Sequence, residues 1–156
     1  MKNNTIMKNT IIVDIDGTIS KLGDRLKYLL REPKNWDSFY AECFEDKPVP
    51  EIIDLVQALY EKGYEIIFCT GRRESCRKDT ARWLENYFTF ELAMASPVLM
   101  RPDGDHRHDT DIKPELLEKA GIDLDTIAFV MEDRNSMVKK WRDMGLICLQ
   151  VAEGDF

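Results

Sequence analysis

Residues 10–19, which read Thr-Ile-Ile-Val-Asp-Ile-Asp-Gly-Thr-Ile, constrain the fold of this chain more than any other stretch. Four apolar or β-branched residues run without interruption up to Asp14, and Gly17 follows closely. Such a run, ended by an acid and a glycine, is typical of a buried parallel strand. Because ligands bind at the carboxyl ends of strands in α/β sheets, we expect Asp14 to lie at the ligand-binding edge of the sheet.

Two acids separated by one residue point to chemistry at this strand end. Asp14 suits a nucleophile that also binds a metal, and Asp16 suits an acid or base beside it, while Gly17 lets the chain turn away at once. A calcium-binding EF-hand loop is excluded, because its glycine is sixth and its glutamate twelfth, whereas this chain has Gly17 fourth and Arg25 twelfth. The plainer alternative is a solvated strand end that carries two incidental acids.

The length and composition predict one soluble domain over residues 1–156. The chain is 44% hydrophobic and 33% charged, and it has no apolar run long enough to span a bilayer. Its net charge of -7 is opposite to the basic surface of a protein that holds long nucleic acid through many phosphates. Any contact with nucleic acid should therefore be local.

The N-terminus and the cysteines indicate a reducing compartment. Residues 1–9 are polar and lack the apolar core and cleavage site of a secretory signal, so we expect a cytoplasmic protein. The cysteines have no C-x-x-C spacing, and we expect reduced core thiols rather than disulfides. They are Cys43, Cys69, Cys76 and Cys148.

Residues 20–50 form an insertion after the first strand. About thirty residues without a clear periodic pattern exceed an ordinary loop between a strand and a helix, and long loops of this kind are often lids or binding loops. We therefore expect a small cap over the site. Its aromatic residues include Trp36 and Phe39, which we expect to pack the insertion onto the core rather than to contact substrate.

Strands and helices alternate through the rest of the chain. Apolar residues at helical spacing, with Pro50 before them and Gly63 after them, predict a helix over residues 51–62. Short apolar runs predict strands, although Pro97 makes the extent of one of them uncertain. The further expected elements are strands at residues 64–70, 92–100, 126–131 and 146–151 and helices at about 74–87, 114–120 and 138–144, the last capped by Ser136. This alternation predicts an α/β fold with a mainly parallel sheet and helices on both faces.

Polar side chains follow several of these strands, and in a parallel sheet the carboxyl ends lie on one edge, where groups remote in sequence converge. Carboxylates there would hold a hard divalent cation such as Mg²⁺, while a hydroxyl, backbone amides and a lysine would hold a phosphate. His106 and His108 are left out, because two histidines without further Cys or His ligands are more often surface residues than a metal site. The expected set is Asp14, Asp16, Thr70, Arg72, Lys113, Glu132 and Asp133.

In chain order, these residues resemble the four motifs of the haloacid dehalogenase superfamily of aspartyl-phosphate phosphatases. Residues 101–109, 132–135, 141–142 and 148–156 further resemble the 3'-phosphatase domain of bacteriophage polynucleotide kinase. The resemblance covers residues 10–156 and implies the three-layer, Rossmann-like α/β fold of the superfamily with a cap after the first strand. The matching motifs are Asp14-x-Asp16-Gly17-Thr18, Thr70-Gly71-Arg72, Lys113 and Glu132-Asp133.

The resemblance also implies a role for each matching residue. The catalytic residues would be the nucleophile Asp14, the general acid and base Asp16, and Lys113, which neutralises the phosphoryl group. The metal ligands would be Asp14, Asp16 and Asp133. The residues that bind the substrate phosphate, or order those that do, would be Arg25, Thr70, Gly71, Arg72 and Asp109.

Two departures from the family pattern limit what is carried over. Glu132 stands where the family usually has aspartate, and its role stays open between supporting Lys113 and reaching the metal through water. The chain also has no G-x-x-x-x-G-K-[ST] motif, so we expect no 5'-kinase activity.

The expected activity is magnesium-dependent hydrolysis of a phosphate monoester through an aspartyl-phosphate intermediate. The preferred substrate is the 3'-phosphate end of a DNA or RNA strand, and no membrane partner is expected. A phosphatase for free mononucleotides or other small phosphates is the first alternative. A non-catalytic binding module with the same fold is the second, although such a module has no need of both Asp14 and Asp16.

Overall fold

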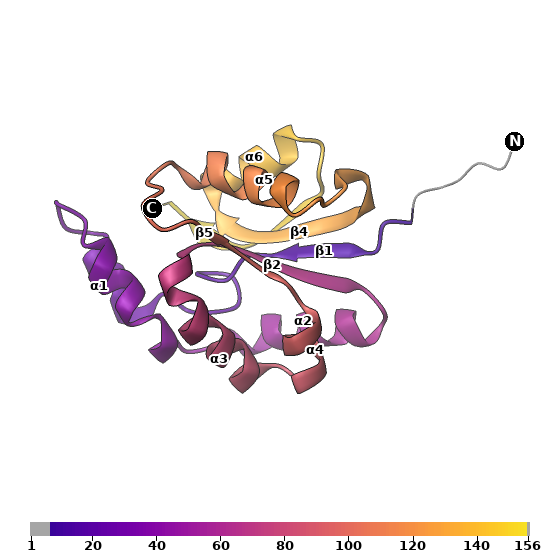
Figure 1. Cartoon of the computed structure of the whole chain (residues 1–156), viewed down its shortest axis with the longest axis horizontal. Helices are drawn as coiled ribbons and strands as arrows, with labels where there is room; N and C mark the ends of the chain where they lie inside the picture. The colour runs from indigo at the N-terminus through magenta and orange to yellow at the C-terminus, as the bar shows by residue number, and fades with distance from the viewer. Residues whose placement is uncertain (1–6, 156) are drawn as a thin grey trace, which may run out of the picture.

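The strand β1 (Thr10–Val13) lies in the middle of a parallel sheet, with later strands on both sides of it (Figure 1). The computed structural model describes residues 7–155. Within them the strand order is β3-β2-β1-β4-β5, and every neighbouring pair is parallel. The other strands are β2 (Glu65–Arg73), β3 (Val98–Arg101), β4 (Ile127–Arg134) and β5 (Cys148–Gly154).

Helices cover both faces of the sheet, as Figure 1 shows. One face carries α2 (Pro50–Glu61), α3 (Arg77–Tyr87) and α4 (Phe90–Ala95). The opposite face carries α5 (Asp109–Lys119) and α6 (Asn135–Asp143). The predicted α/β fold with a parallel sheet between two helical layers is confirmed.

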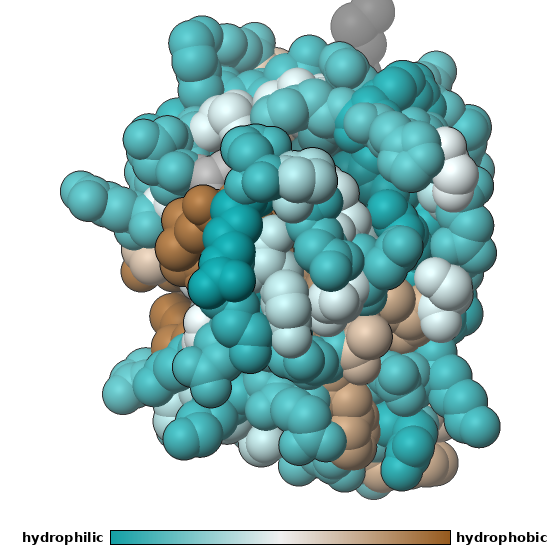
Figure 2. Space-filling model, turned by 90° about the vertical axis from the view of Figure 1, so that its left-hand side faces the viewer, coloured by the Kyte–Doolittle hydropathy of each residue, from teal (hydrophilic) through white to brown (hydrophobic). Residues whose placement is uncertain are grey.

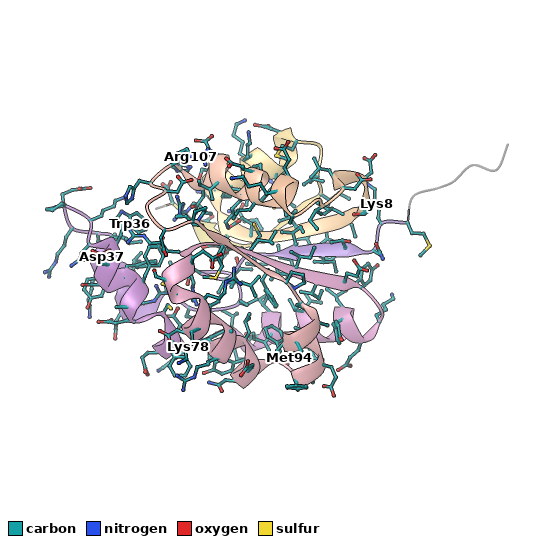
Figure 3. All side chains as sticks on the ribbon, viewed as in Figure 1. Lys8, Trp36, Asp37, Lys78, Met94 and Arg107 are labelled. Carbon is teal, nitrogen blue, oxygen red and sulfur yellow. The ribbon has the colours of Figure 1, made fainter. Side chains whose placement is uncertain are left out.

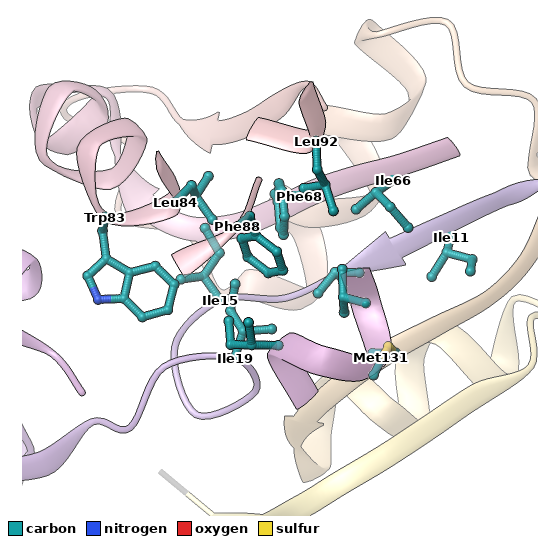
Figure 4. Packing of buried hydrophobic residues seen from close by; sticks show 13 residues of the cluster. Ile11, Ile15, Ile19, Ile66, Phe68, Trp83, Leu84, Phe88, Leu92 and Met131 are labelled. Atoms are coloured by element: carbon teal, nitrogen blue, oxygen red, sulfur yellow. The ribbon is translucent and has the colours of Figure 1, made fainter. Parts of the chain in front are cut away.

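A hydrophobic cluster on each face joins the layers. Because successive side chains of a strand point to opposite faces, Ile11 belongs to the cluster on the side of α3 that also contains Phe68 and Trp83 (Figure 4). Ile12 packs on the other side, in a cluster that contains Trp141 of α6. Full burial of each such side chain contributes about 1.5–3 kcal/mol to folding, so both faces hold β1 in place.

The insertion after β1 folds at the carboxyl end of the sheet. It contains two 3-10 helices, η1 (Gly23–Tyr28) and η2 (Cys43–Glu45), with α1 (Trp36–Ala41) between them. The side chain of Asn35 caps α1 by accepting a hydrogen bond from the backbone N of Ser38 at 3.0 Å. At the far end of the insertion, Trp83 Nε1 on α3 donates a hydrogen bond to the backbone O of Asp46 at 2.8 Å.

The strand expected at residues 92–100 is wrong over its first half. Thr89 accepts a hydrogen bond from the backbone N of Leu92 at 3.4 Å and starts the six-residue helix α4, and β3 begins only at Val98, after Pro97. A short apolar run is compatible with either a strand or a helix, and here the cap at Thr89 favours the helix.

Two expected helix starts are also displaced. The helix expected at residues 114–120 begins earlier, because His108 accepts a hydrogen bond from the backbone N of Thr110 at 3.3 Å, and Pro114 lies inside α5. Ser136 is not a cap: α6 already begins at Asn135, and the preceding residue makes no side-chain capping bond. Lys113 therefore lies within a helix rather than before one.

All four cysteines are buried free thiols, as the sequence predicted. The expectation about a secretory signal concerns residues 1–9, of which residues 1–6 lie outside the described residues. Among the helices of residues 7–155, none has both the length and the apolar character needed to cross a bilayer.

Candidate active site

A cavity of about 290 Å³ opens at the edge of the sheet where β1, β2 and β4 end. Figure 2 views this side of the molecule, whose surface is mostly hydrophilic. The cavity is lined by all the predicted site residues except Arg25 and Arg72. These lining residues are Asp14, Asp16, Thr70, Gly71, Asp109, Lys113, Glu132 and Asp133.

A buried lysine joins two of the carboxylates. Lys113 Nζ donates hydrogen bonds to Asp14 Oδ1 at 2.6 Å and to Glu132 Oε2 at 2.8 Å. Burial alone would lower the pKa of Lys113, but Asp14 and Glu132 raise it well above its usual value. Lys113 therefore stays charged at the base of the cavity, and the geometry favours the supporting role for Glu132.

Both oxygens of Asp14 have hydrogen-bond donors. Oδ1 accepts from Lys113, and Oδ2 accepts from Thr18 Oγ1 at 2.9 Å. Burial, followed by the nearby Glu132, raises the pKa of Asp14 well above its usual value. The two donors fix the orientation of a carboxylate that is otherwise poorly solvated, which is the environment of an activated nucleophile.

Three carboxylates meet closely enough to share a metal ion. Ligand oxygens of Asp14, Glu132 and Asp133 all lie within 4.8 Å of one another, and all three residues are buried. With Lys113 beside them, these groups carry a net charge of about two negative units when fully ionised. A set of oxygen donors with this charge fits a hard divalent cation.

Gly17 gives Asp133 the space that it needs. The φ angle of Gly17 is +86°, in the region that favours glycine, and a Cβ at this position would overlap Asp133 Oδ2. The turn that carries β1 into the insertion therefore depends on glycine in two ways, through its backbone conformation and through its close approach to an acid.

Asp16 lies apart from the acidic trio and binds two arginines. Arg25 Nη2 donates to Asp16 Oδ1 at 2.6 Å, and Arg72 donates through Nε to Oδ2 at 3.0 Å and through Nη2 to Oδ1 at 2.7 Å. Burial would raise the pKa of Asp16, but Arg72 and then Arg25 lower it well below its usual range. The expected role of Asp16 as a metal ligand would place its carboxylate with the trio. Here its carboxylate is engaged by the two arginines instead.

Arg25 and Arg72 are held beneath the cavity by Asp46 of the insertion. Arg25 Nε donates to Asp46 Oδ1 at 2.7 Å, and Arg72 Nη2 donates to Asp46 Oδ2 at 3.3 Å. The two arginines are only 2% and 0% exposed. Their donors are directed at protein oxygens, which favours the second of the two implied roles, ordering Asp16, over direct binding of the phosphate.

A second ion-pair network forms the opposite wall. Asp109 is paired with Arg101 and accepts a hydrogen bond from Arg134 Nη1 at 2.7 Å. Burial would raise the pKa of Asp109, but Lys113, Arg134 and Arg101 lower it. A Cβ at Gly71 would come within 2.7 Å of Asp109 Oδ1, so Gly71 allows this network to approach β2. Asp109 thus places two arginines on the cavity wall.

Comparison with known proteins now decides the family. Residues 8–156 match the family described as the polynucleotide kinase PNKP phosphatase domain. The chain belongs to this family. The PNKP phosphatase domain is a haloacid dehalogenase-type phosphatase, in agreement with the resemblance seen in the sequence motifs.

Solved structures show the same relationship. A chain in the structure of the Pnkp1/Rnl/Hen1 RNA repair complex is 29% identical with a TM-score of 0.80, and the match covers 100% of this chain and 46% of that one. A chain in a second Pnkp1/Rnl/Hen1 complex is 30% identical with a TM-score of 0.77, over 98% of this chain and 49% of that one. This chain therefore spans about half the length of these relatives.

The fold alone extends to a more distant hydrolase. Haloacid dehalogenase-like family protein SP0104 from Streptococcus pneumoniae is 17% identical with a TM-score of 0.60, and the match covers 91% of this chain and 83% of that one. The two chains thus share the fold.

Several residues of the site were not predicted from the sequence. Asp46 lies in a stretch without periodicity, and no sequence signal marks it. Arg101 and Arg134 were visible as charges at strand ends but received no role. Trp36 and Phe39 were expected to pack the insertion onto the core, and both also line the cavity. Trp36 is half-buried, and Phe39 is only 4% exposed. His106 and His108 are exposed, as expected, but line the cavity as well.

The acidic trio predicts an unusual dependence of stability on pH. Burial and the neighbouring Glu132 raise the pKa of Asp133 to about 7, so the folded protein binds more protons than the unfolded chain between about pH 4 and 7. Without metal, the free energy of unfolding should therefore fall by roughly 2 kcal/mol as the pH rises through this window. A divalent cation held by the ionised carboxylates would restore it, and Mg²⁺ is the ion to test.

Urea unfolding at pH 5 and pH 7.5, with and without Mg²⁺, measures this effect. An Asp133→Asn variant is the matched control, because it should flatten the dependence and weaken the response to Mg²⁺. Stability that rises between pH 5 and 7.5 in the absence of metal would contradict the prediction.

Proposed function

We propose that this chain is a magnesium-dependent phosphatase that removes the 3'-phosphate from polynucleotide ends through an aspartyl-phosphate intermediate. The observation that carries the proposal is the arrangement of Asp14, whose oxygens are held by Lys113 and Thr18 in a cavity that also contains Asp16. A nucleophile, a fixed cation and an acid or base thus face one space, in a chain of the PNKP phosphatase domain family.

In the first step, a carboxylate oxygen of Asp14 attacks the phosphorus atom, and the bond to the 3'-oxygen breaks. Asp16 gives the leaving oxygen its proton. Arg25 and Arg72 hold Asp16 ionised in the free site, so it must take up this proton as the substrate enters. The negative charge of the phosphate beside Asp16 favours that uptake.

In the second step, water hydrolyses the aspartyl phosphate. Asp16 is again a carboxylate after the first step and removes a proton from the attacking water. The bond between phosphorus and the Asp14 oxygen breaks, which releases inorganic phosphate and restores the carboxylate. Arg25 and Arg72 keep Asp16 aimed at the same position through both steps.

Positive charge is needed because a dianionic phosphate repels an anionic nucleophile. Lys113 supplies one fixed charge next to Asp14. Mg²⁺ held by Asp14 and Asp133 would neutralise further charge on the phosphoryl oxygens. Arg101 and Arg134 on the opposite wall add electrostatic attraction for the entering anion.

Support for a polynucleotide 3' end comes from the family and from the likeness to chains in RNA repair complexes. Mononucleotides are the second candidate, because the net charge of -7 offers little attraction to a long strand. A non-catalytic module is disfavoured by the complete set of buried acids around Lys113.

A panel of substrates tests the proposal. In Mg²⁺, a 3'-phosphorylated oligonucleotide and a nucleoside 3'-monophosphate should be hydrolysed with similar efficiency, and a nucleoside 5'-monophosphate more slowly. The log-log salt slope should be only about -1 to -2, because one or two phosphates are contacted. EDTA should abolish activity, and Ca²⁺ should inhibit, since its larger and looser shell fits poorly around a phosphoryl group.

Preference for 5'-monophosphates would move the assignment to a nucleotidase. A steep salt slope with preference for long strands would require an extended groove for nucleic acid. Full activity in EDTA would refute the metal role.

A further inference from the structure

A second hollow adjoins the catalytic cavity. Its volume is about 100 Å³, and it shares five lining residues with the larger cavity, so the two spaces are continuous. The acids that surround Lys113 do not line it. The shared residues are Trp36, Tyr40, Arg101, His106 and Arg107.

One wall of this hollow is aromatic and rigidly placed. Trp36 and Tyr40 of α1 are stacked, with ring centroids 6.0 Å apart and an interplanar angle of 23°. Tyr40 donates a hydrogen bond from its hydroxyl to the backbone O of Gly71 at 3.0 Å, at the catalytic end of β2. Trp36 therefore lies beside a ring that is anchored to the site, and it is half-buried and lines the hollow, with Lys34 Nζ 5.9 Å from its ring centroid.

Arg107, on the loop between β3 and α5, lines the same hollow. Figure 3 shows Trp36 and Arg107 on the same side of the molecule, on separate elements. The guanidinium of Arg107 is held by Asp105 Oδ2 at 2.8 Å and by Glu115 Oε2 at 2.8 Å. Its charge is therefore balanced, and its planar group is oriented.

The charge around the hollow argues against a second phosphate as its occupant. Arg73 is paired with Asp37, as Arg107 is paired with Asp105 and Glu115. Arg101 is likewise paired with Asp109. Aromatic and guanidinium planes without excess charge suit a flat, neutral, polar ring, and every nucleobase presents such a face.

We propose that this hollow binds the nucleobase of the phosphorylated terminal nucleotide, stacked on Trp36 while its phosphate lies at Asp14. The inference rests on the proposed function and specifies its substrate as a nucleotide with a base, with little preference among the four bases. Stacking of this kind should contribute about tenfold in efficiency.

A comparison of two oligonucleotides tests this base site. One carries a normal 3'-phosphorylated terminal nucleotide, and the other carries the same terminus without its base. The wild-type enzyme should favour the first by about tenfold in kcat/KM, and Trp36→Ala should bring the ratio close to one by losing efficiency on the first substrate alone. Trp36→Phe should keep most of the preference. Phe90→Ala, which truncates an aromatic residue that is 70% exposed on α4, should leave it unchanged.

Tryptophan fluorescence provides a readout that does not need turnover. Trp83 and Trp141 are 0% exposed, so Trp36 is the tryptophan that a stacked base can reach. In an Asp14→Asn background, a nucleoside 3'-monophosphate should quench fluorescence, whereas an abasic sugar phosphate should not. Adding Trp36→Phe should remove the quenching.

The outcomes separate this inference from the proposed function. Equal hydrolysis with and without the base, by both wild type and Trp36→Ala, would overturn the base site and leave the 3'-phosphatase assignment intact. Quenching by nucleotides without hydrolysis of any 3'-phosphate by the wild-type enzyme would overturn that assignment and support the base site. Loss of both signals would overturn both.

Discussion

Asp14→Asn is expected to reduce kcat/KM on a 3'-phosphorylated oligonucleotide by roughly 10⁴-fold or more, which corresponds to about 5 kcal/mol of barrier. The amide is not a nucleophile, while its carbonyl oxygen can still accept a hydrogen bond from Lys113 or Thr18. Lys113 also keeps Glu132 as a partner at 2.8 Å, so the fold should persist. Enzyme kinetics measure the loss, and urea unfolding measures the persistence of the fold.

Asp143→Asn is a matched control for this substitution. It makes the same chemical change on an exposed acid at the C-terminal end of α6, which does not line the cavity, and should leave kcat/KM within twofold of wild type. Activity of Asp14→Asn within tenfold of wild type, in protein free of host phosphatase, would eliminate Asp14 as the nucleophile.

Lys113→Met should have the next largest effect, on both activity and stability. Removing the ammonium leaves Asp14 and Glu132 as buried carboxylates without their cation, and breaking a buried pair in this way costs about 3–5 kcal/mol. Activity should fall by about 10³-fold or more, because the charge that offsets the phosphate is lost. The stability loss should shrink at low pH, where protonation neutralises the two carboxylates.

The double variant Lys113→Met/Glu132→Gln separates the two effects. Removing one of the unpaired charges should recover a large part of the stability but not the activity. Urea unfolding and kcat/KM on the same preparations measure both quantities. Recovery of activity together with stability would show that Lys113 acts through the fold rather than on the phosphate.

The convergence of Asp14 and Asp133 could be predicted from the sequence because parallel topology brings strand ends to one edge. The apolar runs around these residues set the strands, and each acid follows its run directly. Helix starts were less predictable. The cap by His108 starts α5 five residues before Pro114, and the helix continues through this proline, where a break was expected.

The rest of the site depends on tertiary contacts that leave no local pattern. Asp46 is important because Arg25 and Arg72 lie against it, and neither neighbour is close to it in sequence. The placement of α1, which carries Trp36, likewise involves a tertiary contact, the hydrogen bond from Tyr40 to the backbone O of Gly71 on β2. Spacing and hydrophobic periodicity carry no information on either arrangement.

The ion pairs of Asp46 have a consequence for how substrate reaches the site. Arg25 and Asp46 belong to the insertion, and Arg72 and Asp16 belong to the core, so swinging the insertion outward would separate buried opposite charges. Opening would break the two pairs that cross between the insertion and the core, Arg25–Asp16 and Arg72–Asp46, which favours the closed arrangement. We therefore expect the insertion to keep its position relative to the core when substrate binds. A cavity entrance that does not widen admits a single strand more readily than a duplex. An unpaired 3' end should therefore enter the site more readily than a base-paired one.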